Sequence, residues 1–330
     1  MSLVKLDLSA LTVNEIRQRY LRCPGPVSSR LAGEMARDAR SAVRQMGHTL
    51  QRVRERRRLE RKRLAGLLEL EKGLHKKGFS RIAGVDEAGI GPLAGPVVAA
   101  AVVFPPGTWI EEVDDSKRLD SRKRLALARS IRRRAAAVGL GVAEVAEIQR
   151  LNVYWAGILC MRRAVENLPF RPDHLLIDAR SIPDLPIPQL AVTGGDAAHF
   201  SIAAASIIAK TYRDHLMEGL DRRYPMYGFA KHKGYCTREH QQAIRTHGIC
   251  SAHRSSYPFV EELTGRYSSG YYSLKMRLEP NCSLDALEAF WRDFVALGPR
   301  LSPPERQKLK LLFRSRRRAL MRESQLSFLA

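Results

Sequence analysis

The sequence has few cysteines and no long apolar run. Its five cysteines are scattered and odd in number, and no two of them form a C-x-x-C pair. This spacing argues against a disulfide framework and against a zinc finger, and it is typical of a protein in a reducing compartment. No apolar run approaches the roughly 18 residues that a membrane span needs. The start of the chain lacks the pattern of a secretory signal. We therefore expect a cytoplasmic protein with no membrane contact.

Acidic residues are scarce toward both ends of the chain. The whole sequence has 56 Lys and Arg against 34 Asp and Glu, a net charge of +22. Residues 1–80 contain 19 basic and 8 acidic residues, residues 266–330 contain 13 and 6, and residues 81–265 contain 24 and 20. Basic surfaces attract polyanions through phosphate contacts and counterion release. The distribution predicts nucleic-acid contact by the two basic ends, with a merely solvated surface as the alternative.

Hydrophobic periodicity divides the chain into three predicted parts. Residues 1–80 form a basic helical extension, in which Thr12 and Glu15 have the spacing of a capping box. Residues 81–265 alternate strands with helices, which predicts an α/β domain with a mixed sheet. Its strands are expected at 81–88, 96–104, 140–147, 174–179 and 189–193, and its helices at 121–136, 152–168, 201–224 and 237–248. Residues 266–330 form a second basic extension with helices at 283–297 and 303–323.

Two adjacent acids stand out in the stretch GVDEAGIGPLAG. Asp86 and Glu87 end an apolar strand, and Gly89 and Gly91 follow them. A carboxylate in a buried strand is costly unless it is paired or binds a metal. Successive strand side chains point to opposite faces, so both acids serve one site only where the strand ends or bulges. The glycines supply that backbone freedom, and they let a phosphate or sugar approach the main chain.

Two further acids occupy similar positions. Asp178 ends the strand HLLIDA, and Asp196 follows two glycines just before a helix. Clustered carboxylates bind hard divalent cations such as Mg²⁺ and Mn²⁺. Two such ions about 4 Å apart activate a water and stabilise the leaving oxygen of a phosphodiester. Each acid taken alone is equally consistent with a helix cap or a solvated charge, Asp196 above all. Together they predict metal-dependent phosphoryl chemistry.

At this point the residues resemble a known family. GVDEAGIGPLAGPVVAAAVVFP is similar to the first block of ribonuclease HII, and the further blocks follow in the family's order. They are DDSKRLDSRKR, LLIDA, GGDAAHFSIAAASIIAKTYRD, YPMYGFAKHKGYCTREH and HRSSYPFV. The resemblance implies an RNase H-like fold, with a mixed five-stranded sheet flanked by helices. It also implies endonucleolytic cleavage of RNA in RNA–DNA hybrids, and cleavage 5′ of ribonucleotides embedded in duplex DNA during ribonucleotide excision repair, leaving a 3′-hydroxyl and a 5′-phosphate.

The resemblance also implies the site residues. Asp86, Glu87, Asp178 and Asp196 match the family's four metal-binding carboxylates, so the expected cofactor is Mn²⁺ or Mg²⁺ in a two-metal site. The residues implied in substrate binding are Gly89, Ile90, Gly91, Tyr235, Lys117 and Lys210. The glycine loop matches the backbone that reads the 2′-hydroxyl, the group that distinguishes RNA from DNA. Tyr235 matches the tyrosine that stacks on the next deoxyribose, and the two lysines match positions near substrate phosphates. A core aromatic and a solvated helix residue are the alternatives for Tyr235 and Lys210.

Three positions depart from the family pattern. Ile90 replaces an arginine that contacts phosphate, a contact that isoleucine cannot make. Gly194 replaces a frequent lysine, and Ala179 replaces a common glycine after the third acid. The hypothesis that follows is that the basic extensions partly offset the missing cations.

The last residues raise a question of partners. Gln325–Leu329, with the sequence QLSFL, resemble the short peptides by which bacterial replication and repair proteins bind the sliding clamp. A frayed helix end is the alternative interpretation. Two other functional classes also remain open. One is a non-catalytic nucleic-acid-binding protein with the same fold, and the other is a related metal nuclease that acts on structured DNA.

Overall fold

The N-terminal helices form a small core of their own. The computed structural model describes residues 8–20, 27–264, 267–278 and 283–327. It begins with η1 (Leu8–Ala10), α1 (Val13–Tyr20), α2 (Ser29–Ala36), α3 (Ser41–Leu67) and α4 (Glu69–Lys76). The predicted capping box is confirmed, since the backbone N–H of Thr12 donates to Glu15 Oε2 (2.7 Å) and that of Glu15 to Thr12 Oγ1 (3.3 Å). Ile16 of α1, Met35 of α2 and Val43 of α3 pack together in this core.

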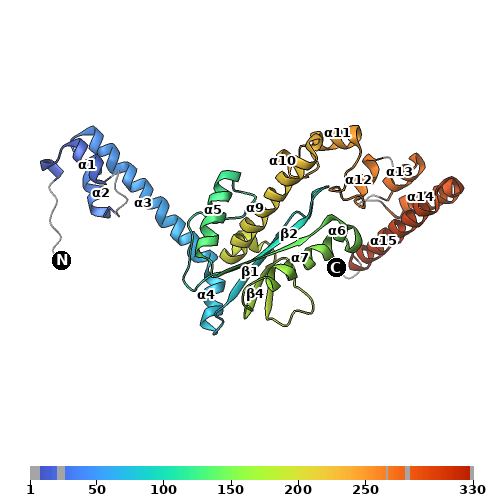
Figure 1. Cartoon of the computed structure of the whole chain (residues 1–330), viewed down its shortest axis with the longest axis horizontal. Coiled ribbons are helices and arrows are strands. Elements are labelled where there is room, and N and C mark those ends of the chain that lie inside the picture. Colours follow the sequence, from blue (N-terminus) through green and yellow to red (C-terminus); the bar gives the residue numbers. More distant parts are fainter. Residues whose placement is uncertain (1–7, 21–26, 265–266, 279–282, 328–330) are drawn as a thin grey trace. The chain divides into compact units, whose positions relative to one another are not determined.

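Helix α3 is a long basic helix with an unusual pattern of exposure. It has 27 residues, and Figure 1 shows it as one uninterrupted helix. Residues 51–59 are all exposed, so this stretch has no face that packs on a core. A helix that is polar all round is stabilised by its own side-chain pairs rather than by burial. Apart from the contacts of Arg54 with Val27 and of Arg56 with Glu112, the exposed stretch is therefore available to a partner.

A five-stranded sheet forms the centre of the fold, as predicted. Its strands are β1 (Ile82–Ala88), β2 (Val97–Val103), β3 (Ala137–Ala143), β4 (His174–Asp178) and β5 (Gln189–Val192). Their order is β3-β2-β1-β4-β5 in a mixed sheet flanked by helices. Strands β1 and β4 are parallel, and so are β4 and β5. The acids at the C-terminal ends of β1 and β4 therefore lie at the same edge of the sheet.

The sheet is made of small apolar residues because a helix lies close against it. Every residue of β2 is buried, and three of its seven residues are alanines. On β1, a Cβ at Gly84 would come within 2.1 Å of the Ser201 backbone. Only glycine permits this contact with α9 (Phe200–Arg223), so Gly84 fixes the distance between the helix and the strand.

The remaining helices complete the fold and are labelled in Figure 1 where space allows. They are α5 (Ser121–Arg134), α6 (Val145–Leu151), α7 (Val153–Glu166), α8 (Gly195–Ala198), η2 (Pro225–Tyr227), α10 (Phe229–His232), α11 (Arg238–His247), α12 (Pro258–Leu263), α13 (Ser269–Met276), α14 (Leu284–Leu297), η3 (Gly298–Arg300) and α15 (Pro303–Ser327). None of the described helices is long and apolar enough to cross a membrane.

Two secondary-structure predictions were wrong. The strand expected at 140–147 ends at Ala143, and α6 begins two residues later. The reason is a capping box between Glu144 and Glu147, which starts a helix where apolar alternation suggested more strand. The C-terminal part contains three α-helices rather than two, since the tyrosine-rich stretch at Ser269–Met276 forms α13 with Ser268 as its N-cap.

The chain divides into two compact units. The first comprises Met1–Asp86, Ala100–Leu140 and Ala164–Ile208, and the second comprises Glu87–Ala99, Gly141–Arg163 and Ala209–Ala330. The peptide bond between Asp86 and Glu87 is therefore one of the places where the chain passes from the first unit to the second. Each unit is described by itself below.

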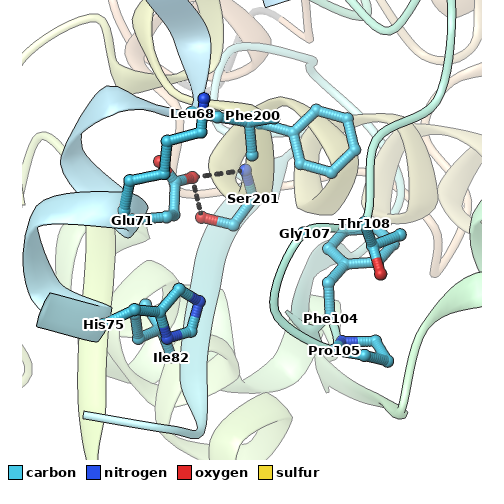
Figure 2. A pocket seen from close by; sticks show the side chains of 11 residues that line it. Leu68, Glu71, His75, Ile82, Phe104, Pro105, Gly107, Thr108, Phe200 and Ser201 are labelled. Atoms are coloured by element: carbon cyan, nitrogen blue, oxygen red, sulfur yellow. Dashed lines mark hydrogen bonds between the residues drawn. The ribbon is translucent and has the colours of Figure 1, made fainter. Parts of the chain in front are cut away.

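Helix α4 is part of the first unit's core, although it lies within the predicted extension. Its Leu74 packs with Ile82 of β1, Leu176 of β4 and Ile202 of α9. Glu71 is buried, and its Oε1 accepts hydrogen bonds from the backbone N–H of Ser201 (3.0 Å) and from its hydroxyl (2.8 Å), beside a small cavity of about 40 Å³ (Figure 2). A carboxylate at a helix N-terminus satisfies amides that have no partner inside the helix. Glu71 thus attaches α4 to the start of α9.

Candidate active site

Three of the four predicted carboxylates lie in the first unit. Val85 of β1 pairs with Ile177 of β4. The next residues, Asp86 and Asp178, therefore occupy neighbouring positions on adjacent parallel strands, which are about 5 Å apart. Asp86 is 4% exposed and Asp178 is partly buried. The register of the sheet thus brings together two acids that are 92 positions apart in the sequence.

Asp196 joins this pair through its short helix. It lies in α8 and is buried, and the backbone N–H of its neighbour Gly195 donates to Asp178 Oδ1 at 2.8 Å. Gly194, with φ of +69°, is the N-cap of α8. Asp196 therefore does not cap this helix, and that alternative interpretation was wrong. The left-handed backbone at position 194 favours the glycine found there over a lysine.

Lys117 lies among the three acids. Its Nζ is 2.8 Å from Asp196 Oδ2 and 3.9 Å from Asp115 Oδ1. The hydrogen bond that Lys117 donates to Asp196, supported by the charges of Asp115 and Asp86, raises the pKa of Lys117. Burial raises the pKa of Asp178, and the negative charge of Asp196 raises it further. Asp86, Asp178 and Asp196 thus share one electrostatic environment in which negative charge is concentrated.

This donor set fits a hard divalent cation. Within the described part of the chain, no three His, Cys, Asp or Glu side chains are gathered tightly enough to form a complete metal site. The Lys117 ammonium lies on Asp196 instead. The oxygen ligands are nevertheless of the type that Mg²⁺ and Mn²⁺ prefer. The raised pKa of Asp178 indicates that its ionised form gains from additional positive charge nearby.

Glu87 belongs to the second unit and has a different neighbourhood. Strand β1 continues to Ala88, so the side chains of Asp86 and Glu87 alternate across it. Burial raises the pKa of the Cys160 thiol on α7, and the charge of Glu87 adds to this effect. The Glu87 carboxylate is therefore close enough to α7 for its charge to act on Cys160. Strand β1 ends one residue after Glu87, at Ala88.

A buried arginine forms hydrogen bonds with the main chain of the predicted glycine loop. Arg254 is 0% exposed, and its guanidinium donates to the carbonyl oxygens of Gly89 (2.6 Å), Ile90 (2.9 Å) and Gly95 (2.8 Å). Tyr257 donates a further hydrogen bond to Ile90 O at 2.9 Å. These bonds fix the main chain of the loop and do not involve the side chain at position 90.

A second buried arginine packs beside the first. Arg213 is also 0% exposed and donates to the carbonyls of Ala94, Pro96 and Lys233, each at 3.0 Å. Gly89 has φ of +100°, and a Cβ there would lie 2.1 Å from Arg213 Nε. Burial lowers the pKa of Arg213 to about 10, and the neighbouring Arg254 charge contributes to this. Gly89 is thus required both by its backbone conformation and by the space that Arg213 occupies.

Tyr235 and Lys210 lie next to this arginine pair. The Arg213 guanidinium carbon is 5.9 Å from the centre of the Tyr235 ring, and Lys210 Nζ is 5.5 Å from it. Tyr235 is 43% exposed, so it is not a core aromatic. Lys210 forms an ion pair with Asp214 at 2.7 Å, and its side chain is only 17% exposed. It is therefore not simply a solvated helix residue. The second unit thus brings Gly89, Ile90, Tyr235 and Lys210 together around Arg213 and Arg254.

Buried histidines support the backbone of Tyr235. The Cys250 N–H donates to His253 Nδ1 (3.0 Å), so His253 Nε2 donates to His240 Nε2 (3.1 Å) and His240 Nδ1 donates to the Tyr235 carbonyl (2.9 Å). Burial lowers the pKa of both histidines to about 4, so both are neutral near pH 7. The chain of donors and acceptors is complete with neutral rings, and it fixes the position of Tyr235 from behind.

Comparison with known proteins shows the family to which the chain belongs. A family model described as Ribonuclease HII matches residues 83–260, more than half of the chain. The chain belongs to the ribonuclease HII family. It is 47% identical to a ribonuclease HII of Myxococcus xanthus over 260 residues, which cover 78% of this chain and 89% of the relative. It is 50% identical to one of Moorella thermoacetica over 198 residues, covering 60% and 96%.

A solved structure of the ribonuclease H2 from Pyrococcus horikoshii OT3 is also similar. It is 24% identical, has a TM-score of 0.47, and the match covers 56% of this chain and 98% of that one. As a member of the ribonuclease HII family, the protein is an endonuclease that hydrolyses RNA in RNA–DNA hybrids.

The structure also explains one departure from the ribonuclease HII pattern. Ala179, where the family commonly has glycine, has φ of +58°. This left-handed conformation costs an alanine of the order of 1 kcal/mol and costs a glycine almost nothing. The strained residue directly follows Asp178, one of the candidate metal ligands.

Proposed function

We propose that this ribonuclease HII cleaves on the 5′ side of ribonucleotides, both in RNA–DNA hybrids and at single ribonucleotides embedded in duplex DNA. The products would carry a 3′-hydroxyl and a 5′-phosphate. The observation that supports the chemistry best is the shared electrostatic environment of Asp86, Asp178 and Asp196. Three carboxylates in one environment suit a reaction that requires divalent cations at the scissile phosphate.

The metal ligands in this proposal are Asp86, Glu87, Asp178 and Asp196. Two Mg²⁺ or Mn²⁺ ions held there would supply an activated water and stabilise the leaving oxygen. The Gly195 amide orients the Asp178 carboxylate, and Lys117 neutralises Asp196 and supplies a cation near the substrate phosphate. The contacts of Asp178, Asp196 and Lys117 support these proposed roles.

Substrate selection in this proposal depends on the second unit. The carbonyls of Gly89 and Ile90 are fixed by Arg254, so the loop keeps its backbone shape with isoleucine in place of the family's arginine. The main chain of the loop therefore keeps the shape needed to contact the 2′-hydroxyl, although the replacement of arginine by Ile90 removes one phosphate contact. The exposed Tyr235 ring offers an apolar face for the neighbouring deoxyribose.

A substrate panel tests this proposal. We would incubate the full chain with Mn²⁺ or Mg²⁺ and three end-labelled duplexes: DNA with one ribonucleotide, all-DNA, and an RNA–DNA hybrid. The expected result is cleavage of the hybrid, cleavage 5′ of the single ribonucleotide, and no cleavage of all-DNA.

The pattern of failure separates the other two functional classes. Cleavage of a branched all-DNA substrate would favour a nuclease for structured DNA. Binding without cleavage of any substrate would favour the non-catalytic protein. Cleavage of the hybrid alone would mean that junction recognition was lost with the arginine that Ile90 replaces.

We propose that the exposed stretch of α3 contacts substrate phosphates. Arg52, Arg57 and Arg61 are exposed, and within the described residues they carry no ion pair or hydrogen bond. Changing all three to glutamine should weaken duplex binding about tenfold or more at low salt. It should also reduce the slope of log K against log[salt] by about 2 to 3, because each phosphate contact contributes roughly 0.9. Fluorescence anisotropy without divalent metal measures both quantities.

The control for this experiment has the same charge change elsewhere. Arg129, Arg132 and Arg133 on α5 are also exposed. Their triple glutamine variant should keep the wild-type salt slope. Equal slopes for the two triple variants would show that α3 acts only through net charge. Substitution is preferred to deletion of the extension, since a deletion to residue 78 would remove Glu71 and Leu74 from the core.

The clamp contact remains a separate proposal. Gln325, Leu326 and Ser327 are the last residues of α15, and Phe328 and Leu329 fall outside the described residues. Pull-down with the bacterial sliding clamp, with and without residues 324–330, would test whether the QLSFL peptide binds it.

A further inference from the structure

Two side chains in the C-terminal half of α3, Glu60 and Arg63, form hydrogen bonds with a loop of the first unit, residues 112–117. Glu60 Oε1 accepts a hydrogen bond from the backbone N–H of Glu112 at 2.7 Å. Arg63 donates to the carbonyl of Val113 at 2.8 Å, and Glu60 and Arg63 are joined by an ion pair at 2.8 Å. One ion pair thus binds the backbone N–H of Glu112 and the carbonyl of the next residue, Val113.

This loop has an unfavourable backbone conformation at one of the residues that α3 binds. Glu112 has φ of +66°, in the left-handed region that residues other than glycine rarely adopt. Such conformations persist only where the surroundings hold them. The bond from the Glu112 amide to Glu60 is one such restraint, and the Glu112 carboxylate adds ion pairs to Arg56 (3.3 Å) and Lys123 (3.1 Å).

This loop leads directly to Lys117. After Val113, Asp114 Oδ1 accepts from the Asp115 amide (2.8 Å), and Asp115 Oδ1 accepts from the Lys117 amide (2.9 Å). Lys117 then extends to Asp196. Ser116 adds a second attachment, since its hydroxyl lies 2.8 Å from that of Ser206. A continuous series of short contacts therefore connects α3 to the lysine beside the carboxylates.

The same helix contains a matched pair that lacks this connection. Glu55 and Arg58 have the same i,i+3 spacing, and their two hydrogen bonds (2.9 and 2.8 Å) equal those of Glu60 and Arg63. Arg58 is 74% exposed, compared with 35% for Arg63. Within the described residues, Glu55 and Arg58 make no bond to the loop, so this pair separates the effect of holding the loop from the effect of a helix ion pair.

We propose that Glu60 and Arg63 are positioning residues that hold the loop of residues 112–117 so that Lys117 reaches Asp196. The N-terminal extension would then contribute to the rate of the reaction as well as to binding. This inference rests on the proposed function for its kinetic part, but the restraint on the loop does not depend on it.

Hydrogen exchange and kinetics of the full chain test the proposal together. In Arg63→Met, we expect the amides of residues 112–117 to exchange about tenfold faster without nucleic acid. We also expect kcat to fall about tenfold with KM changed less than twofold, because a misplaced catalytic group lowers the rate more than the affinity. In a Lys117→Met background, Arg63→Met should produce no further loss of kcat, since the group that it positions is absent.

Arg58→Met is the control and should change neither exchange of the loop nor kcat. Glu60→Gln, which keeps an acceptor for the Glu112 amide but removes the ion pair, replaces Arg63→Met if the latter is unfolded by circular dichroism. Unchanged exchange of residues 112–117 would overturn the proposal. An equal loss of kcat with and without Lys117 would overturn it as well. If the wild type cleaves nothing, the proposed function fails, while the exchange experiment still decides whether α3 restrains the loop.

Discussion

Replacing Asp86 with asparagine is expected to lower the cleavage rate at least about 10³-fold, equivalent to about 4 kcal/mol of transition-state stabilisation. The change keeps the size of the side chain and removes one negative charge from the environment that Asp86 shares with Lys117, Asp178 and Asp196. A neutral amide is a poor ligand for Mg²⁺ compared with a carboxylate. Single-turnover cleavage of duplex DNA with one ribonucleotide, at saturating enzyme and metal, measures the loss.

Binding and stability should behave differently from the rate in this variant. Duplex affinity without metal should stay within about threefold of wild type, because Asp86 contributes no positive charge to phosphate binding. Asp184→Asn, an exposed acid between β4 and β5, is the control and should retain full activity. A rate within tenfold of wild type for Asp86→Asn would remove this residue from the set of metal ligands.

The acids could be predicted from the sequence because they interrupt apolar strands. A carboxylate at the end of a buried strand is expensive, so its presence carries information that an exposed acid does not. Local sequence cannot give the register that makes Asp86 and Asp178 neighbours. That register depends on which strands lie side by side, and strand order is determined by packing across the whole domain.

The supports of the glycine loop could not be predicted in this way. Arg213 lies on a long helix and Arg254 in a loop, and both read as ordinary surface cations in a chain with 56 basic residues. Only the folded structure shows that both arginines are buried and donate hydrogen bonds to the carbonyls of the loop. His240 and His253 were missed for the same reason, since their role depends on contacts between segments that are distant in sequence. The proposed functional side chains were thus visible in the sequence, and the residues that hold them were not.

The extension shows a related limit. Composition separated residues 1–80 from the rest by their charge, and charge describes the surface rather than the packing. Glu71 and Leu74 join the core of the first unit, and Glu60 and Arg63 hold one of its loops. The same basic segment thus combines exposed arginines with side chains that hold a loop of the first unit.

Replacing Arg254 with methionine is expected to destabilise the protein by about 3 kcal/mol or more, although no metal ligand or substrate group changes. Methionine fills much of the same volume but donates no hydrogen bond, so the buried carbonyls of Gly89, Ile90 and Gly95 lose their donor. Each unsatisfied buried polar group costs roughly 1 to 3 kcal/mol. Relief of the repulsion between Arg254 and Arg213 offsets a part of this cost. Urea unfolding monitored by circular dichroism measures the difference.

The same variant should separate loop geometry from metal chemistry. Below its unfolding transition, Arg254→Met should lose cleavage of the single-ribonucleotide duplex more than tenfold relative to cleavage of the RNA–DNA hybrid, because one embedded ribonucleotide offers a single 2′-hydroxyl for the loop to read. Arg245→Met, an exposed arginine of α11, controls for loss of charge and should leave both the stability and this ratio unchanged. An equal loss of cleavage on both substrates would mean that Arg254 supports the fold of the second unit without shaping the glycine loop. A stable variant with an unchanged ratio would mean that the glycine loop keeps its shape without the buried guanidinium.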